Sequence, residues 1–118
     1  MTRALNILHV FPSFKIGGAQ VRFTQLAKGF GPEFSHTVIA LDGAYTAAQF
    51  LSPGIRVILG GQPHTKGSLP SRIGHYRHEI AARAPDLLMT YNWGSIEWAM
   101  ANAFGRVPHI HMEDGFGP

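Results

Sequence analysis

The sequence predicts a three-layer α/β domain with a parallel, Rossmann-like sheet of five strands in the order 3-2-1-4-5. One observation predicts this fold class, and the length of the chain is compatible with it. Short apolar runs of strand length alternate along the chain with segments whose apolar residues recur at helical spacing. That alternation is typical of a parallel sheet covered by helices on both faces. The length of 118 residues allows one such domain.

The first strand, loop and helix lie between residues 5 and 30. Residues 5–11 are mostly apolar, as expected of a strand buried on both faces. Pro12 ends this strand, and the glycine pair Gly17-Gly18 lies in the loop that follows. Residues 19–30 then predict a helix, which glycines and a proline end. Its apolar stripe is Ala19, Phe23, Leu26, Ala27 and Phe30.

The middle of the chain predicts two further strands and a short helix. Residues 37–41 and residues 55–59 are apolar runs of strand length. Residues 44–51 lie between them and favour a short helix. These two strands would extend the sheet beyond the first one.

The last part of the chain repeats the alternation twice more. Residues 73–84 carry apolar side chains at helical spacing, and Pro85 ends that helix. Residues 86–91 form the fourth predicted strand and residues 96–104 the last helix. Residues 107–112 supply the fifth strand. No helix follows it in the sequence to cover the sheet, so we expect the chain to be part of a longer protein.

Composition excludes several classes of function. The chain contains no cysteine, which excludes a disulfide scaffold, a thiolate zinc site and a cysteine nucleophile. The net charge is +3, and the lysines and arginines are scattered, so nucleic-acid binding is not supported. No secretion signal and no apolar run of membrane-spanning length is present. We therefore expect a cytoplasmic protein.

The glycine pair Gly17-Gly18 lies where a buried strand passes into a helix. Free backbone N–H groups and the positive end of the helix dipole can hold an anion at such a place. A tight turn without a ligand explains the pair equally well. The three spaced glycines of a dinucleotide-binding fingerprint are absent, which disfavours a nicotinamide or flavin site.

Ionisable residues gather at the end of the fifth predicted strand. His109 and His111 alternate onto one side of it, and Glu113 and Asp114 follow. Ligands of open α/β sheets bind at the carboxyl ends of the strands, which makes this cluster a candidate site. A polar strand end whose groups satisfy one another is the alternative.

Two further residues follow the fourth strand at the same predicted edge. Asn92 offers an amide and Trp93 an indole to a polar, ring-shaped ligand, although Trp93 is equally suited to packing. His75 and His78 lie three apart on a predicted helix without a third ligand. We expect that pair to face solvent and predict no metal site.

Three segments of the chain resemble the retaining glycosyltransferases of the family-four type, which have the two-domain GT-B fold. Residues 7–20, ILHVFPSFKIGGAQ, resemble the opening of these enzymes. Residues 85–95 look like their fourth strand and the loop after it, and residues 107–118 look like the next strand and loop. The resemblance spans nearly the whole chain.

The resemblance implies a domain role and an activity. Residues 1–118 would form the N-terminal, acceptor-side domain, and the donor-binding C-terminal domain would lie outside this chain. The full enzyme would transfer a sugar, with retention, from a nucleotide sugar to a glycan or lipid-linked acceptor. The nucleotide sugar is a substrate, so no separate cofactor is implied. The chain alone would be inactive.

The resemblance also assigns roles to individual residues. Gly17 and Gly18 would lie near the donor diphosphate. Many members of the family end the fifth strand with a histidine that contacts the donor sugar, and Asp114 stands at that place here. A shift of one position in the alignment would assign the contact with the donor sugar to another residue, so we name Asp114 and His111 together as catalytic candidates. Our candidates for binding substrate are Asn92, Trp93 and Glu113.

Two rival functions stay open. One is a stand-alone, non-catalytic module that binds phosphate or assembles with another chain. The other is a sugar-nucleotide epimerase of the same two-domain architecture, with His111, Glu113 and Asp114 as acid and base groups. Peripheral membrane association of the full enzyme and self-association of this chain are further expectations that the sequence leaves open.

Overall fold

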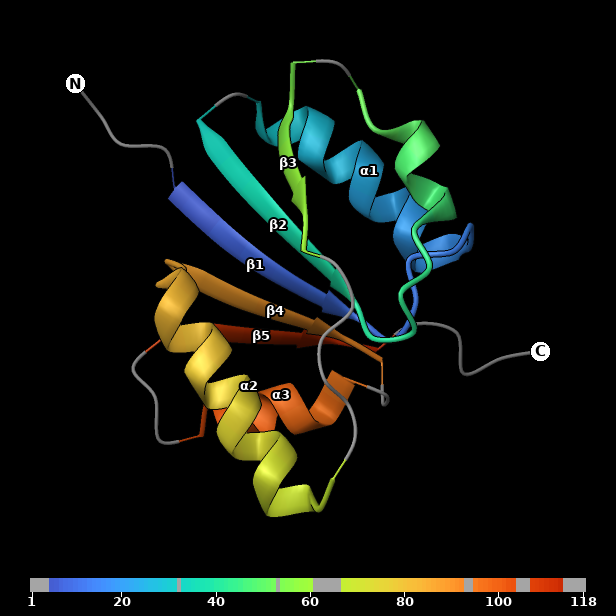
Figure 1. Cartoon of the computed structure of the whole chain (residues 1–118). Coiled ribbons are helices and arrows are strands. Elements are labelled where there is room, and N and C mark those ends of the chain that lie inside the picture. Colours follow the sequence, from blue (N-terminus) through green and yellow to red (C-terminus); the bar gives the residue numbers. More distant parts are fainter. Residues whose placement is uncertain are drawn as a thin grey trace.

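A computed structural model describes residues 5–31, 33–52, 54–60, 67–92, 95–103 and 107–113. Five parallel strands form one sheet in the order β3-β2-β1-β4-β5, as predicted. All five run in the same direction (Figure 1). The strands are β1 (Leu5–Phe11), β2 (Phe34–Ala40), β3 (Arg56–Leu59), β4 (Leu87–Tyr91) and β5 (His109–Met112).

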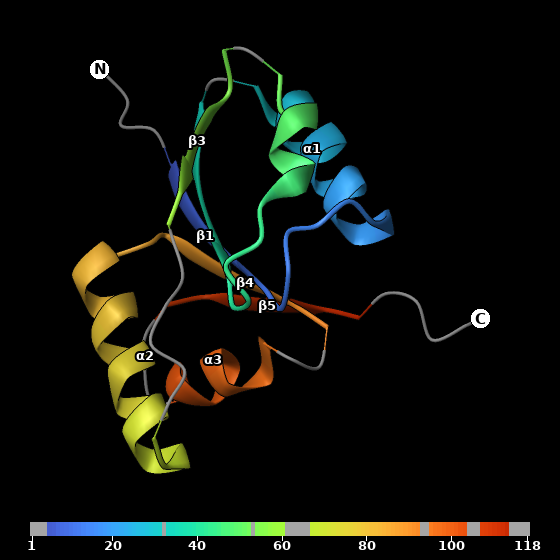
Figure 2. The same cartoon turned by 45° about the vertical axis from the view of Figure 1, so that its right-hand side comes forward.

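Helices cover both faces of this sheet and make the three predicted layers. The helix α1 (Gly18–Phe30) and the short 3-10 helix η1 (Thr46–Phe50) lie on one face. The helices α2 (Leu69–Arg83) and α3 (Ile96–Ala101) pack together on the other. Figure 2 shows the sheet between these two layers. Across the described ranges, none of the helices combines the length and the apolar character needed to span a membrane.

Each face of the sheet has its own apolar core. On the side of α2 and α3, the indole of Trp98 stacks on the ring of Tyr76 with centroids 4.6 Å apart. On the side of α1, Phe11 stacks on Tyr91 at 3.9 Å and meets Phe23 edge-on. Aromatic pairs in these arrangements add to the stabilisation that burial alone provides. The carboxyl ends of β1 and β4 are buried between these two cores.

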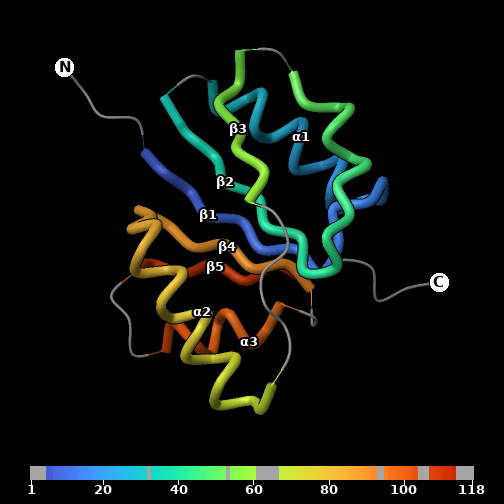
Figure 3. The backbone as a smooth tube through the Cα atoms, viewed as in Figure 1, coloured from blue at the N-terminus to red at the C-terminus, as the bar shows by residue number. Residues whose placement is uncertain are grey.

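The register of the sheet decides which side chains meet at its edge. Ile7 pairs with Leu87 across β1 and β4, and Thr90 pairs with His111 across β4 and β5. The carboxyl ends of β1, β4 and β5 therefore gather at one edge, which Figure 3 shows along the backbone. Those candidate residues after these strands that the structure describes are brought to this edge.

Several element bounds differ from the predictions, and the largest difference is at α2, which begins at Leu69, four residues earlier than predicted. The strand β2 begins at Phe34, three residues earlier than predicted, because its polar start pairs with β1 and His36 is buried against His9. The helix α3 ends at Ala101, where the side chain of Asn102 donates to the carbonyl of Val107 at 2.9 Å and turns the chain toward β5. The strand β5 begins at His109, two residues later than predicted.

Candidate functional site

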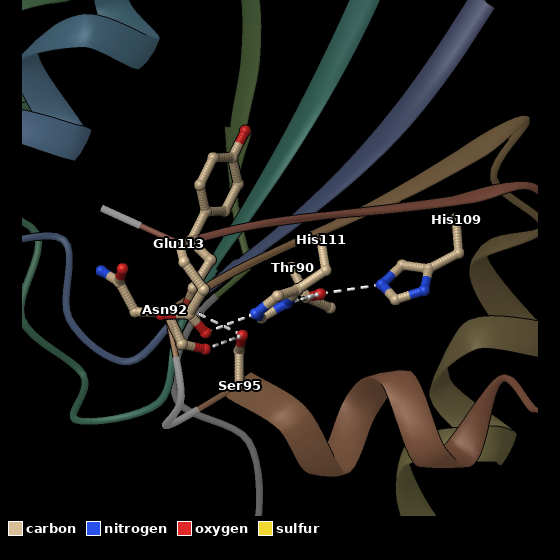
Figure 4. Close-up of polar contacts among 7 residues, drawn as sticks. Thr90, Asn92, Ser95, His109, His111 and Glu113 are labelled. Atoms are coloured by element: carbon tan, nitrogen blue, oxygen red, sulfur yellow. Dashed lines mark hydrogen bonds and ion pairs between the residues drawn. The ribbon is translucent and has the colours of Figure 1, made fainter. Parts of the chain in front are cut away.

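A threonine and two histidines form the centre of the candidate site. Thr90 is fully buried on β4, and its Oγ1 lies 2.8 Å from His109 Nε2 and 2.7 Å from His111 Nδ1. The two histidines reach the same hydroxyl because residues two apart on a strand point to the same face. Figure 4 shows both imidazoles converging on Thr90 above α3. The structure thus confirms that His109 and His111 share one side of β5.

His111 is held at its other nitrogen by a carboxylate. Its Nε2 lies 2.6 Å from Glu113 Oε1, and the exposed fractions of the two side chains are 23% and 31%. An ionised carboxylate only accepts hydrogen bonds, so the Nε2 atom of His111 carries the hydrogen of this contact. A carboxylate that orients an imidazole in this way is the arrangement of an acid–base dyad.

The pKa of His109 is lowered from its ordinary value. Partial burial of the imidazole is the larger cause, and the positive charge that His111 can carry is the second. His109 is consequently neutral in the neutral pH range. A neutral imidazole has one N–H group and one bare nitrogen, so it can serve as donor or acceptor toward Thr90.

The loop after β4 brings Asn92 to the same edge. Asn92 adopts the left-handed conformation with φ of 62°, and its backbone N–H donates to the carbonyl of Met112 at 2.8 Å. The buried Ser95 hydroxyl lies 2.8 Å from the carbonyl oxygen of Tyr91 and 2.9 Å from that of Asn92. These bonds hold Asn92 and Ser95 at the carboxyl ends of β4 and β5. A role of Asn92 in binding substrate stays a prediction.

The glycine pair lies at the start of α1, as predicted. Gly17 precedes the first residue of the helix, Gly18, and no side chain caps this helix end. The backbone of Gly17 is extended, with φ of −171°, so its conformation does not require glycine. A Cβ atom there would lie 2.8 Å from Oε1 of Gln20, whose Nε2 donates to the carbonyl of Ser13 at 2.7 Å. A side chain at this position would require the flexible end of Gln20 to move, and the role of Gly17 toward a phosphate stays a prediction.

A hollow beside the dyad connects α1 with the carboxyl edge of the sheet. It is small, with a volume of about 30 Å³, and Glu113 lines it together with Met112 of β5. Most of its wall is apolar, and Arg22 of α1 adds a positive group to it. The lining residues are Ala19, Arg22, Phe23, Leu26, Tyr91, Met112 and Glu113. Glu113 thus joins the histidine cluster on one face of the sheet to this hollow on the other.

Other predicted positions lie away from this site or outside the described residues. Trp93 and Asp114 belong to the parts of the chain that the structure does not describe. His75 lies on α2 with its Nε2 atom 3.9 Å from a carboxylate oxygen of Glu79, and His78 is exposed on the same helix. Among the residues the structure describes, no three histidine or carboxylate side chains converge as a metal site would require.

Sequence reasoning missed Thr90, because a threonine inside an apolar strand is unremarkable until its partners are known. It also missed a second, fully buried histidine pair on the α1 side. His9 Nδ1 lies 2.8 Å from the Tyr91 hydroxyl, and His9 Nε2 lies 2.9 Å from His36 Nδ1. Burial lowers the pKa of both histidines, and the neighbouring His36 lowers that of His9 further. The available signal was the presence of two histidines in or beside runs that were otherwise apolar.

The fold has a counterpart among solved structures. A crystal structure from Listeria monocytogenes, provisionally described as a UDP-N-acetylglucosamine 2-epimerase, aligns with a TM-score of 0.58 at 20% sequence identity. The alignment covers 92% of this chain and 30% of that protein, so this chain spans less than a third of its length. No protein-family model matches the sequence, and no curated protein matches it significantly. The likeness establishes a shared Rossmann-like α/β fold.

Proposed function

We propose that this chain is the N-terminal, acceptor-side domain of a two-domain enzyme that acts on nucleotide sugars. The observation that carries the proposal is the arrangement at the carboxyl edge of the sheet. There the His111–Glu113 dyad, with its 2.6 Å contact, lies beside a hollow walled by the first turns of α1. Ligands of open α/β sheets bind at this edge, where strand order reverses.

The finer proposal is a retaining glycosyltransferase, to which the three sequence segments also point. The bond between the sugar's anomeric carbon and the diphosphate oxygen breaks in that reaction, and negative charge develops on the departing diphosphate. The backbone N–H groups that begin α1 at Gly18 would stabilise this charge, since no side chain caps them. Glu113 and His111 would bind hydroxyl groups of the sugar, with Asn92 and Trp93 on the acceptor side and Asp114 beside the donor sugar.

A binding experiment on this chain tests the coarser proposal. The chain is labelled with ¹⁵N and titrated with UDP-glucose, UDP-N-acetylglucosamine and GDP-mannose, with glucose as the control. We expect weak binding that shifts the amide resonances of Gly18 and Glu113 and leaves the exposed His78 unchanged, because half of a cleft retains few contacts. Resonances at the edge that do not move with any of the three compounds would contradict the proposal. Sugar transfer by the chain alone would contradict its assignment as half of an enzyme.

The gene itself tests the two-domain plan. We expect the reading frame to continue past the codon of Pro118 for at least one further domain, roughly 150–250 residues, containing paired glutamates with nearby arginine and lysine. A stop codon directly after Pro118 would remove the donor-binding half. A stand-alone binding or assembly module would then be the best-supported function.

A second candidate function is epimerisation of a nucleotide sugar. The dyad favours it, since inversion of a sugar carbon needs dedicated acid and base groups. The Listeria structure carries a description of that kind. The two activities differ in their need for an acceptor. Incubating the two-domain protein with nucleotide sugar alone should yield no epimer if the protein is a transferase, and should yield one if it is an epimerase.

A further inference from the structure

The Thr90 hydroxyl contacts two histidines but has one hydrogen to donate. A hydroxyl group carries one hydrogen and two lone pairs. Both imidazole nitrogens lie at hydrogen-bonding distance, 2.8 Å for His109 Nε2 and 2.7 Å for His111 Nδ1. Thr90 can therefore donate to one histidine and must accept from the other.

When His111 is neutral, the carboxylate of Glu113 decides which partner donates in each hydrogen bond between His111, Thr90 and His109. His111 Nε2 donates to Glu113 Oε1, so the single hydrogen of the neutral ring is on Nε2 and Nδ1 is a bare acceptor. Thr90 then donates to His111 Nδ1. Its lone pair accepts from His109 Nε2, which makes His109 the Nε2–H tautomer.

Protonation of His111 exchanges donor and acceptor in both hydrogen bonds that Thr90 makes. The imidazolium carries hydrogens on both nitrogens, so His111 Nδ1 becomes the donor and Thr90 the acceptor. The Thr90 hydrogen must then point to His109 Nε2, which has to be bare. His109 is forced into the Nδ1–H tautomer.

We propose that Thr90 is a positioning residue that couples His109 to His111 as a proton relay. A proton that arrives at His109 Nδ1 releases the hydrogen of His109 Nε2 to the Thr90 oxygen, and the former hydroxyl hydrogen moves to His111 Nδ1. One proton enters, the imidazolium of His111 forms, and His109 ends as the neutral Nδ1–H tautomer. The return of a proton from His111 follows the same steps in reverse.

The surroundings fit a relay that joins solvent to the dyad. His109 is an exposed residue, Thr90 is fully buried, and His111 lies between them and Glu113. The helix packed against this cluster, α3, carries one charged residue, Glu97, and Arg72 of α2 binds both oxygens of its carboxylate at 2.8 Å. The titratable groups that face the relay in the described residues are therefore its own two imidazoles and Glu113. Burial and the neighbouring His111 lower the pKa of His109.

The relay rests on the proposed function for its purpose, since it would resupply the proton that His111 exchanges with a sugar hydroxyl. Its existence is a property of this chain alone. The ring-nitrogen resonances of all histidines can be followed by ¹⁵N NMR between pH 8 and pH 5. These resonances distinguish the two neutral tautomers from each other and from the imidazolium.

We expect His109 to change from the Nε2–H to the Nδ1–H tautomer at the same midpoint at which His111 becomes charged. Thr90→Val should abolish this tautomer change, and Thr90→Ser should restore it. Thr24→Val is the matched control, because it removes a buried hydroxyl, bonded to Val21, from the opposite core. If Thr90→Val does not fold, the wild-type titration and the variant His109→Gln, at an exposed position, still test the relay. The latter should shift the titration midpoint of His111.

Two outcomes overturn the relay. One is a His109 tautomer that stays the same while His111 becomes charged. The other is a tautomer change that persists in Thr90→Val. Failure of the proposed function has a different signature, since nucleotide sugars would then leave the resonances of Glu113 unmoved while the coupled histidine titration persisted.

Discussion

Lowering the pH should destabilise this fold through the buried pair His9 and His36. Both imidazoles are fully enclosed between the sheet and α1, at 1% and 0% exposure. The helix presents Phe23, Thr24 and Ala27 to this core, and its charged residues lie on its exposed side. The titratable groups in contact with the pair are the two imidazoles themselves and the Tyr91 hydroxyl. No carboxylate of the described residues is in contact with the pair to compensate a positive charge.

The sign and size of the effect follow from the lowered pKa values. Burial lowers the pKa of His9 and of His36 below the 6.5 of an exposed histidine, so the unfolded chain binds more protons just below that pH. Stability is therefore fully present above pH 6.5 and falls as the pH drops toward the folded-state values. Each histidine contributes up to about 1.4 kcal/mol per pH unit, and the pair up to about 2.7 kcal/mol per pH unit.

Urea unfolding at pH 8, 7, 6 and 5, followed by tryptophan fluorescence, measures this slope. His36→Leu removes one titrating group and the neighbour that disfavours charge on His9. We expect the slope below pH 6.5 to fall by up to about 1.4 kcal/mol per pH unit in this variant, whatever its stability at pH 8. His78→Gln on the exposed side of α2 is the matched control and should keep the wild-type slope.

The reasoning is refuted if the wild-type free energy of unfolding is constant between pH 8 and pH 5. It is also refuted if His36→Leu and the wild type lose stability in parallel, because the slope would then come from other groups. His109, whose pKa is also lowered, contributes equally to all three proteins and cancels in the comparison.

Three further predictions concern glycines and an ion pair. Gly60→Ala should destabilise by about 1–3 kcal/mol in urea unfolding, because its Cβ would lie 2.9 Å from the Cγ1 atom of Ile39. Gly74→Ala should stabilise by about 0.5–1 kcal/mol in the same assay, since its Cβ would meet open space inside a helix. Arg72→Gln should raise the pKa of Glu97, measured by ¹³C NMR of the carboxyl group, because the hydrogen bonds from Arg72 hold that pKa below its usual range.

Each of these has a result that contradicts it. If Gly60→Ala leaves the free energy of unfolding unchanged, β2 makes room for the added methyl group without loss of stability. A destabilising Gly74→Ala would mean that the exposed face of α2 is covered. An unchanged pKa of Glu97 would mean that another cation replaces Arg72.

Local patterns in the sequence were sufficient for most of the fold. Residues 5–11 and 87–91 are mostly apolar runs, and α1 carries an apolar stripe at helical spacing, so their type and position followed from periodicity. The order 3-2-1-4-5 followed from the rules that connect parallel strands through helices. The start of β2 could not be predicted in this way, because Ser35 and His36 interrupt its apolar pattern and only pairing with β1 makes them a strand.

The candidate site was predictable as a place but not as a mechanism. Chain order alone put His109, His111 and Glu113 at the carboxyl end of the last strand, and alternation put the two histidines on one face. The partner at the centre, Thr90, lies 19 and 21 residues away from them in the sequence. Its role depends on the register of β4 against β5, since a slip of one residue would turn its hydroxyl to the other face.

The sequence by itself determined the class of the fold, the order of the strands and the edge at which polar groups gather, because these depend on periodicity and on short-range geometry. Tertiary structure alone decided which polar groups meet. His9 lies 27 residues from His36 and 82 from Tyr91, yet the three share one buried chain of hydrogen bonds. Hydrogen bonding acts over about 3 Å, and register and packing, which no local pattern encodes, bring such distant residues within that reach.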